Sequence, residues 1–406
     1  MWRWMWSCSG WRVVRLTKPR IGSLFSGYGG LDLAVESFFD ADTAWHCEWD
    51  DAPSKILAHH WPDVPNFRDV TTVNWSEVPP VDIITGGSPC QDLSAAGKRA
   101  GMTEGTRSNL WVNMREAINQ LRPRLVVWEN VRGALSATAT SESDMEPGEG
   151  PLGGGGGHLR ALGRVLGDLA SIGYDARWQL LRASDVGAPH HRARVFLVAY
   201  PANTGSIGLQ AARRDSGPSA SLAGLVGGSG ALPGDLTHLP TPTTRMQDDT
   251  ASQRDRNYPG LEIVGVHFPE AVAGEAEYLP TPDANPGGGG QKTAEERRAD
   301  NRTVSVNNAV MGLDTSTSPF GKYVPVVRRW EQVTGMAAPA PTEPNRNGKP
   351  RLNAAFAEWM MGLPAGWVTE VPGVTRAQQL KACGNGVVPQ QAAAALAHLI
   401  GGEAPA

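Results

Sequence analysis

Short apolar runs alternate with amphipathic stretches between residues 20 and 200, and this alternation constrains the fold more than any other feature of the chain. The runs with the length and composition of buried strands are 20–25, 43–47, 81–85, 125–131, 174–182 and 194–199. Helical stretches are expected from about Leu31 and over 51–61, 108–122 and 158–172. Strands that alternate with helices predict an α/β domain with a mostly parallel, Rossmann-like sheet.

Two of these runs end in residues that carry chemistry. The run 81–85 leads through Gly86-Gly87 into Ser-Pro-Cys90-Gln, and the run 125–131 contains Glu129. The carboxyl ends of parallel strands are where such sheets bind ligands. A lone cysteine is usually a small buried hydrophobe, and this is the prediction for Cys8, Cys47 and Cys383. Cys90 differs because it follows a proline in a polar, glycine-flanked loop, so a nucleophilic thiol is predicted there.

A cofactor site is predicted at the first strand end. Phe-Ser-Gly-Tyr-Gly-Gly, residues 25–30, follows a strand and opens a helix, so a ligand can approach backbone N–H groups there. Glycine-rich turns also occur for packing alone. Glu48 at the next strand end is suited to ribose hydroxyls, and Asp69, at a third strand-like position, to an adenine amino group. These residues favour a nucleoside-containing cofactor, whereas the spacing does not match the G-x-G-x-x-G pattern of dinucleotide sites.

The thiol needs a basic neighbour or a helix N-terminus to ionise, because a free cysteine has a pKa of about 8.5. The candidates are His190, His191, Arg192 and Arg194, in Ala-Pro-His-His-Arg-Ala-Arg. The alternative for this segment is a solvated basic turn before a strand.

Composition limits the class of protein. The 406 residues are 40% hydrophobic and 19% charged with a net charge of −4, which is not the balance of a nonspecific nucleic-acid binder. A local basic cleft remains compatible with it. The four cysteines show no spacing for a zinc site or disulfide framework, and no metal is expected. No apolar stretch reaches membrane-spanning length, so a cytoplasmic location is expected, with nucleoid association when DNA is bound.

The rest of the chain changes character along its length. Residues 134–157 are rich in Ser, Thr, Glu and Gly and predict a flexible insertion. Residues 201–345 lose strong periodicity, and Leu-Pro-Thr-Pro occurs there twice, at 239–242 and 279–282. That region is either a pair of extended linkers or a loop-rich recognition module. Order returns near 351, and the Ala-rich helix from Pro389 needs a core, so residues 346–406 are expected to fold back onto 20–200.

Six blocks of sequence together resemble the DNA (cytosine-5) methyltransferase family. In chain order they are F-S-G-Y-G-G, E-W-D, G-G-S-P-C-Q-D-L-S, E-N-V, R-A-R and G-N-G-V-V-P, spread over 20–200 and 350–400. The region 201–345 falls where that family carries its target recognition domain, and residues 1–19 lie outside the resemblance. Three positions depart from the family pattern: His190 replaces a glutamine, Gly386 a serine, and Arg68-Asp-Val70 a Gly-Asp-Ile.

The resemblance implies an enzyme that transfers a methyl group from S-adenosylmethionine to C5 of cytosine in double-stranded DNA, after base flipping. Cys90 would attack C6, Glu129 would hold or protonate N3, and Arg194 would contact O2, with Arg192 also in the catalytic set. The expected cofactor-binding residues are Phe25, Ser26, Gly27, Gly29, Gly30, Glu48, Trp49, Asp69, Val70, Pro89, Asn385 and Val387. The loop residues expected to meet DNA are Ser94, Lys98 and Arg99.

Several alternatives stay open at this point. The same catalytic blocks would serve methylation of cytosine in RNA, and a catalytically silent DNA-binding relative is a hypothesis of another class. A nicotinamide-dependent oxidoreductase is a third interpretation of the glycine turn, against which the thiol–carboxylate pair argues. A monomer is expected, either solitary or with a cognate restriction endonuclease as its partner.

Overall fold

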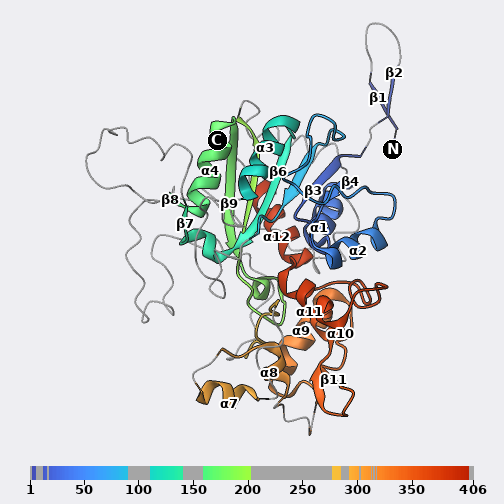
Figure 1. The fold of residues 1–406 in the computed structure, drawn as a ribbon, viewed down its shortest axis with the longest axis vertical. Helices are drawn as coiled ribbons and strands as arrows, with labels where there is room; N and C mark the ends of the chain where they lie inside the picture. The colour runs from blue at the N-terminus through green and yellow to red at the C-terminus, as the bar shows by residue number, and fades with distance from the viewer. Residues whose placement is uncertain are drawn as a thin grey trace, which may run out of the picture.

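The computed structural model describes residues 2–5, 12–15, 18–89, 110–139, 159–202, 277–284, 292–300, 303–311, 313, 316 and 318–401. In Figure 1 these residues form an upper body around a sheet and a lower body of short helices. In the amino-terminal segment that the sequence left unassigned, β1 (Trp2–Met5) pairs antiparallel with β2 (Arg12–Arg15). Within the described residues, no helix is both long and apolar enough to cross a membrane.

The upper body contains a sheet whose described strands follow the order β4-β3-β5-β6-β10-β9 (Figure 1). The strands are β3 (Arg20–Leu24), β4 (Asp42–Cys47), β5 (Ile83–Gly86), β6 (Leu125–Val131), β9 (Tyr174–Leu181) and β10 (Arg194–Pro201). The pairs β3–β4, β3–β5 and β5–β6 are parallel, whereas β10 runs antiparallel to β6 and to β9. The predicted α/β class with a mostly parallel sheet is confirmed.

Helices cover both faces of the sheet. On one face α1 (Gly30–Phe39) packs against α12 (Pro389–Gly401), and their buried residues share one hydrophobic cluster. On the other face α3 (Trp111–Leu121) and α4 (Ala161–Ser171) contribute to a second cluster. The helix α2 (Asp51–His60) buries Ile56 in the first cluster. Each helix thus turns its apolar stripe to the sheet, as the sequence pattern predicted.

Two predicted boundaries on this side of the molecule need correction. The helix expected from 158 begins at Ala161, because Leu159–Arg160 forms β8 and pairs antiparallel with β7 (Thr138–Ala139). The start predicted for the flexible insertion, residue 134, is wrong. Ala134 is fully buried in the short 3₁₀ helix η2 (Arg132–Leu135). The rest of the insertion, 140–158, lies outside the described residues.

The lower body joins parts of two predicted regions. Its elements are α7 (Ala294–Ala299), α8 (Val306–Met311), η7 (Gly321–Tyr323), α9 (Val324–Thr334), β11 (Thr342–Pro344), β12 (Pro350–Leu352), α10 (Ala354–Met360) and α11 (Arg376–Asn385) (Figure 1). Trp330 of α9 is fully buried and donates its indole N–H to the carbonyl of Trp359 in α10, at 2.9 Å. Of the predicted segment 346–406, α12 packs on α1, β9 and β10 and α11 contacts α2, so both reach the upper body. The helix α10 packs with α11 and bonds to α9.

Candidate active site

The glycine turn between β3 and α1 has the open backbone that a ligand-binding turn requires. Phe25 has a φ of 53° and Gly29 a φ of 84°, both in the left-handed region. A Cβ placed on Gly27 would meet no heavy atom within 4 Å. The N–H of Gly27 donates to Oε2 of Glu48 at 2.8 Å. The first and second strand ends are thus joined directly, as the sequence predicted for a single site.

Glu48 is held from several sides at the end of β4. Its Oε1 accepts the N–H of Asp50 at 2.8 Å, and its own N–H donates to Oδ1 of Asn66 at 2.9 Å. The carboxyl is buried, and this burial raises its pKa. Trp49 beside it is 69% exposed, which singles it out among the large apolar side chains of the described residues. An exposed indole next to a buried acid suits a ligand with a flat ring and hydroxyl groups.

A buried carboxylate beneath the turn was not predicted from the sequence. Asp32 of α1 accepts hydrogen bonds from Ser23 Oγ at 2.7 Å and from Thr85 Oγ1 at 2.6 Å. Ser23 Oγ also lies 2.7 Å from Ser26 Oγ in the glycine turn. Burial raises the pKa of Asp32 to about 6. The network ties the turn to β5, whose end leads toward Cys90.

The carboxyl-terminal segment closes over the same turn. The hydroxyl of Tyr28 donates to the carbonyl of Val387 at 2.7 Å. A Cβ on Gly30 would lie 2.3 Å from that carbonyl oxygen, and a Cβ on Gly386 only 1.8 Å from the ring of Tyr28. The ring therefore fills the space that a serine side chain would need at position 386. Asn385 is the last residue of α11 and stands beside this contact in the chain.

The loop that leads to Cys90 is anchored at Ser88. The side-chain N–H of Asn130 donates to the carbonyl of Ser88 at 3.1 Å, and Trp128 donates to Ser88 Oγ at 3.1 Å. Both donors lie on β6, next to Glu129, so these bonds fix Pro89 relative to β6. None of Ser88, Trp128 and Asn130 was predicted as a site residue. Ser88 and Asn130 nevertheless lie in the blocks G-G-S-P-C-Q-D-L-S and E-N-V, and Trp128 lies in the run 125–131.

Glu129 and Arg194 form a buried ion pair, with 2.9 Å between Nε and Oε1. The register of β6 and β10 brings them together, because Arg194 pairs with Val131 and Phe196 with Glu129. Burial raises the pKa of Glu129, and the positive charges of Arg194 and Arg192 partly offset this effect. A Cβ on Gly87 would lie 3.1 Å from Glu129 Oε2, so the glycine leaves space beside the carboxyl.

Arg192 lies near Glu129 but bonds mainly to the backbone. Its guanidinium donates to the carbonyls of Gly384 at 3.0 Å and Pro282 at 3.3 Å, and also to that of Gly386. Its side chain is 3% exposed. Arg192 thus links the start of β10 to the strand-free segment at Pro282 and to the end of α11, and its place in the catalytic set stays a prediction from the resemblance.

The neighbouring histidines both have lowered pKa values. His190 is fully buried, its Nε2 lies 3.0 Å from the carbonyl of Met360, and burial lowers its pKa to about 3. Burial also lowers the pKa of His191, whose ring lies 4.4 Å from that of Tyr278. His190 thus makes a neutral structural contact at the position where the family pattern has a glutamine.

Asp69 does not lie at a strand end. It occupies an irregular segment between α2 and β5, where its Oδ1 accepts the N–H of Thr71 at 3.0 Å and the hydroxyl of Thr71 at 2.8 Å. Val70 beside it is buried. The residue before Asp69 is nevertheless tied to β4. The carbonyl of Arg68 contacts the thiol of Cys47 at the end of that strand.

The two cysteines that the structure describes, Cys47 and Cys383, are buried, as predicted. Cys47 and Cys383 are each 1% exposed, and burial raises the pKa of both thiols, that of Cys47 to about 12. Both are therefore inert small core residues. Cys8, the predicted nucleophile Cys90 and the predicted DNA-contacting residues Ser94, Lys98 and Arg99 lie outside the described residues.

Comparison with known proteins identifies relatives. The type II methyltransferase M.NgoFVII of Neisseria gonorrhoeae is 30% identical over 46% of this chain and 45% of its own length. A DNA N-6-adenine-methyltransferase of Escherichia phage P1 is 31% identical over 44% of this chain and 28% of its own. The type II methyltransferase M.HhaI of Haemophilus parahaemolyticus is 28% identical over 46% of this chain and 50% of its own. The chain thus spans half or less of the length of these relatives.

The solved structure of the Dnmt2 methyltransferase of S. pombe covers 95% of this chain and 99% of its own, at 12% identity and a TM-score of 0.48. Residues 20–401 match the C-5 cytosine-specific DNA methylases as a family. This match includes the glycine turn, the Ser88–Pro89 loop, the Glu129–Arg194 pair and the closing segment at 385–387. The chain therefore belongs to the family of C-5 cytosine-specific DNA methylases.

Proposed function

We propose that the protein transfers a methyl group from S-adenosylmethionine to C5 of cytosine within a short sequence of double-stranded DNA. The observation that carries the proposal is the buried Glu129–Arg194 pair, placed beside the Ser88–Pro89 loop that leads to Cys90. The pair and the loop lie at the same edge of the sheet as the glycine turn. One edge of the sheet therefore carries an acid, the loop that leads to a thiol and the turn proposed to hold a nucleoside.

The residues at the glycine turn fit S-adenosylmethionine, which supplies the methyl group when bound. Phe25, Ser26, Gly27, Gly29 and Gly30 would hold its methionine portion, because the space above Gly27 is open. The buried carboxyl of Glu48 would accept hydrogen bonds from the ribose hydroxyls. The exposed indole of Trp49 would pack on the adenine. The remaining residues proposed to line this site are Asp69, Val70, Pro89, Asn385 and Val387.

The chemistry proposed for the chain begins with Cys90. C5 of cytosine is a weak nucleophile until C6 carries an adduct, so thiolate attack at C6 divides one difficult step into easier ones. Glu129 would protonate N3 as this bond forms, and Arg194 would contact O2 and hold the carboxyl in place. C5, activated in this way, would then take the methyl group that bound S-adenosylmethionine supplies. Loss of the C5 proton to a base expels the thiolate from C6, N3 gives its proton back, and 5-methylcytosine remains.

The target atom is inaccessible inside a duplex, so we infer that the base is flipped out at a cost of a few kcal/mol. The segment 94–106 contains Lys98, Arg99 and several glycines, a composition suited to a loop that closes on phosphates. A cognate restriction endonuclease, a monomeric state and a cytoplasmic, nucleoid-associated location remain predictions from the sequence.

The deciding experiment is base-resolution mapping of methylation in DNA from cells that express the intact protein or Cys90→Ala. We expect 5-methylcytosine in one short sequence with the intact protein and none with the variant. N6-methyladenine, or methylated RNA with unmethylated DNA, would replace the proposed substrate. In the same preparations S-adenosylmethionine should raise the unfolding temperature of both forms and NAD should raise neither. Turnover by Cys90→Ala near that of the intact protein would refute the nucleophile.

A further inference from the structure

One copy of the repeated Leu-Pro-Thr-Pro sequence lies against the candidate active site. The segment Leu279–Pro282, called the strap below, forms a parallel bridge with His190, and the N–H of Leu279 donates to the carbonyl of Pro189 at 2.8 Å. Leu279 is 3% exposed, so its side chain anchors the segment in the core. From the sequence, the region that contains this repeat is either a pair of linkers or a recognition module.

Beyond Leu279, the strap bonds to Arg192 twice. The backbone N–H of Arg192 donates to Thr281 Oγ1 at 3.2 Å, and its guanidinium donates to the carbonyl of Pro282 at 3.3 Å. The carbonyl of Arg192 accepts the side-chain N–H of Gln391 in α12 at 2.9 Å. Arg192 thus connects the strap, the sheet edge and the carboxyl-terminal helix.

The backbone of Arg192 is strained at this point. Its φ is 33°, which is rare and unfavourable for a residue with a Cβ. Such a conformation persists only where its surroundings hold it, and the bonds from Thr281, Pro282 and Gln391 provide that restraint. Two residues later Arg194 starts β10 and forms the ion pair with Glu129. The turn that contains Arg192 therefore sets where Arg194 leaves the sheet edge.

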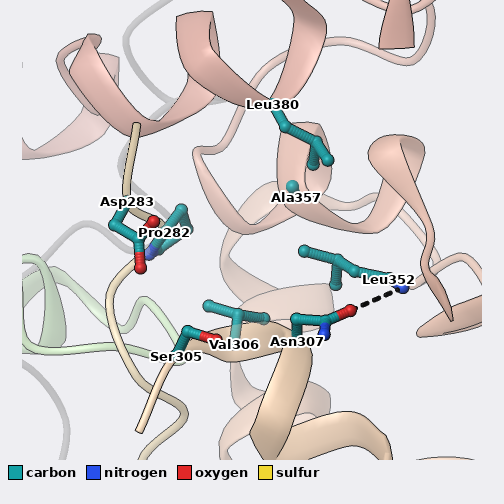
Figure 2. Close-up of a pocket in the computed structure, with 8 residues that line it drawn as sticks. All are labelled: Pro282, Asp283, Ser305, Val306, Asn307, Leu352, Ala357 and Leu380. Atoms are coloured by element: carbon teal, nitrogen blue, oxygen red, sulfur yellow. Dashed lines mark hydrogen bonds between the residues drawn. The ribbon is translucent and has the colours of Figure 1, made fainter. Parts of the chain in front are cut away.

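The carboxyl-terminal end of the strap, at Pro282, packs against the lower body. Pro282 and Asp283 line a cavity of about 10 Å³ together with residues of α8, β12, α10 and α11, as Figure 2 shows. That volume suits about one water, so the cavity is a packing seam and not a ligand site. A Cβ on Gly384 would lie 2.2 Å from the backbone of Asp283, so this contact is tight.

We propose that the Leu279–Pro282 strap is a positioning element for the catalytic pair, in which Thr281 acts through the strained turn at Arg192 to hold Arg194 against Glu129. The inference rests on the proposed function for its catalytic consequence.

The test uses three variants of the full chain. Thr281→Val keeps the shape of the side chain but removes the oxygen that accepts the Arg192 N–H. Thr281→Ser retains that oxygen, and Thr241→Val makes the matched change in the other copy of the repeat. The measurements are hydrogen exchange of the peptide that contains Arg192, kcat and KM for DNA methylation, and the Kd for S-adenosylmethionine.

For Thr281→Val we expect about tenfold faster exchange of the Arg192 amide, the loss of one hydrogen bond. We also expect kcat to fall about tenfold, with KM for DNA and the Kd for S-adenosylmethionine within twofold of wild type. Thr281→Ser should restore both exchange and kcat, and Thr241→Val should leave exchange of the Arg192 amide as in wild type.

Faster exchange with unchanged kcat would overturn the positioning role, and wild-type exchange would overturn the bond itself. Equally faster exchange of the Arg192 amide in Thr241→Val would overturn the assignment of this bond to Thr281, and a parallel loss of cofactor affinity in Thr281→Val would mark a merely structural role. If the wild-type protein methylated no DNA, the proposed function would fail. The exchange measurement would still test the link between the strap and Arg192.

Discussion

At the scale of single residues, the proposed chemistry depends on the protonation of Glu129. Its carboxyl is buried, burial raises its pKa, and the charges of Arg194 and Arg192 offset only part of that effect. A carboxyl with a raised pKa stays protonated to higher pH, which suits a group that donates to a ring nitrogen. The ion pair with Arg194 at 2.9 Å also fixes its orientation.

Glu129→Gln tests this role. The amide keeps the shape of the side chain but cannot transfer a proton, so we expect kcat to fall by about 10²–10⁴-fold. The Kd for S-adenosylmethionine should change little, since the glycine turn is held by Glu48 and not by Glu129. Single-turnover methylation and calorimetric titration measure the two quantities. An equal loss of both would indicate a damaged fold.

The pH profile supplies a second check on the same residue. The protonated form of Glu129 is the active one in this mechanism, so kcat of the wild-type protein should decline as pH rises through the raised pKa. The residual activity of Glu129→Gln should lack that decline, because the amide does not titrate. A decline of the same position and size in the variant would assign the titration to another group.

At the scale of elements, the site is closed by a contact between two distant turns. The β3–α1 turn carries Tyr28, and the turn between α11 and α12 carries Gly386 and Val387. The Tyr28 ring leaves no space for a Cβ at 386, and its hydroxyl bonds to the Val387 carbonyl. Tyrosine at 28 and glycine at 386 are therefore complementary in volume.

A double-mutant cycle tests that complementarity. Gly386→Ser should lower both the unfolding temperature and the affinity for S-adenosylmethionine, since overpacking typically costs about 1–3 kcal/mol. Adding Tyr28→Leu should recover part of both losses by vacating the space. Tyr28→Phe, which keeps the ring, isolates the bond to Val387. Strictly additive effects in the double variant would contradict the proposed packing.

At the scale of the whole molecule, the two ends of the insertion after η2 lie next to each other. Its ends pair as β7 and β8, with Ala139 opposite Leu159, and the N–H of Ala161 donates to the carbonyl of Ala137 at 3.0 Å. Paired ends of this kind need only a short connection. The paired ends could therefore be joined by a short turn in place of residues 140–158.

Replacing residues 140–158 by Asn-Gly should preserve the fold. The two new residues would form a two-residue hairpin turn between Ala139 and Leu159, and closing a shorter loop costs less entropy. We expect the free energy of unfolding to stay within about 1 kcal/mol of wild type. Deletion of 134–157 is the contrast, because it removes buried Ala134 and β7, and it should destabilise the protein strongly. Equal stability of the two variants in thermal unfolding would contradict this boundary.

The elements of the upper body were predictable because their signals are local. Apolar runs ended at Gly86 and Glu48, and helical stripes such as Trp111, Met114 and Ile118 face the core as their spacing indicated. Carboxyl ends of parallel strands meet at one edge, so the glycine turn, Glu48 and Glu129 were expected to share a site. The structure places them at that edge, and Gly27 contacts Glu48 directly.

The sequence by itself determined the order of strands and helices in the upper body and the edge at which the site lies, because periodicity and turn residues act over a few positions. Only the tertiary structure decided the antiparallel insertion of β10 between β6 and β9, which brings Arg194 to Glu129. It also decided the burial of Trp330 against α10 and the bridge between Leu279 and His190. Those contacts join residues 29 to 89 positions apart, so their energy comes from partners that no local pattern identifies.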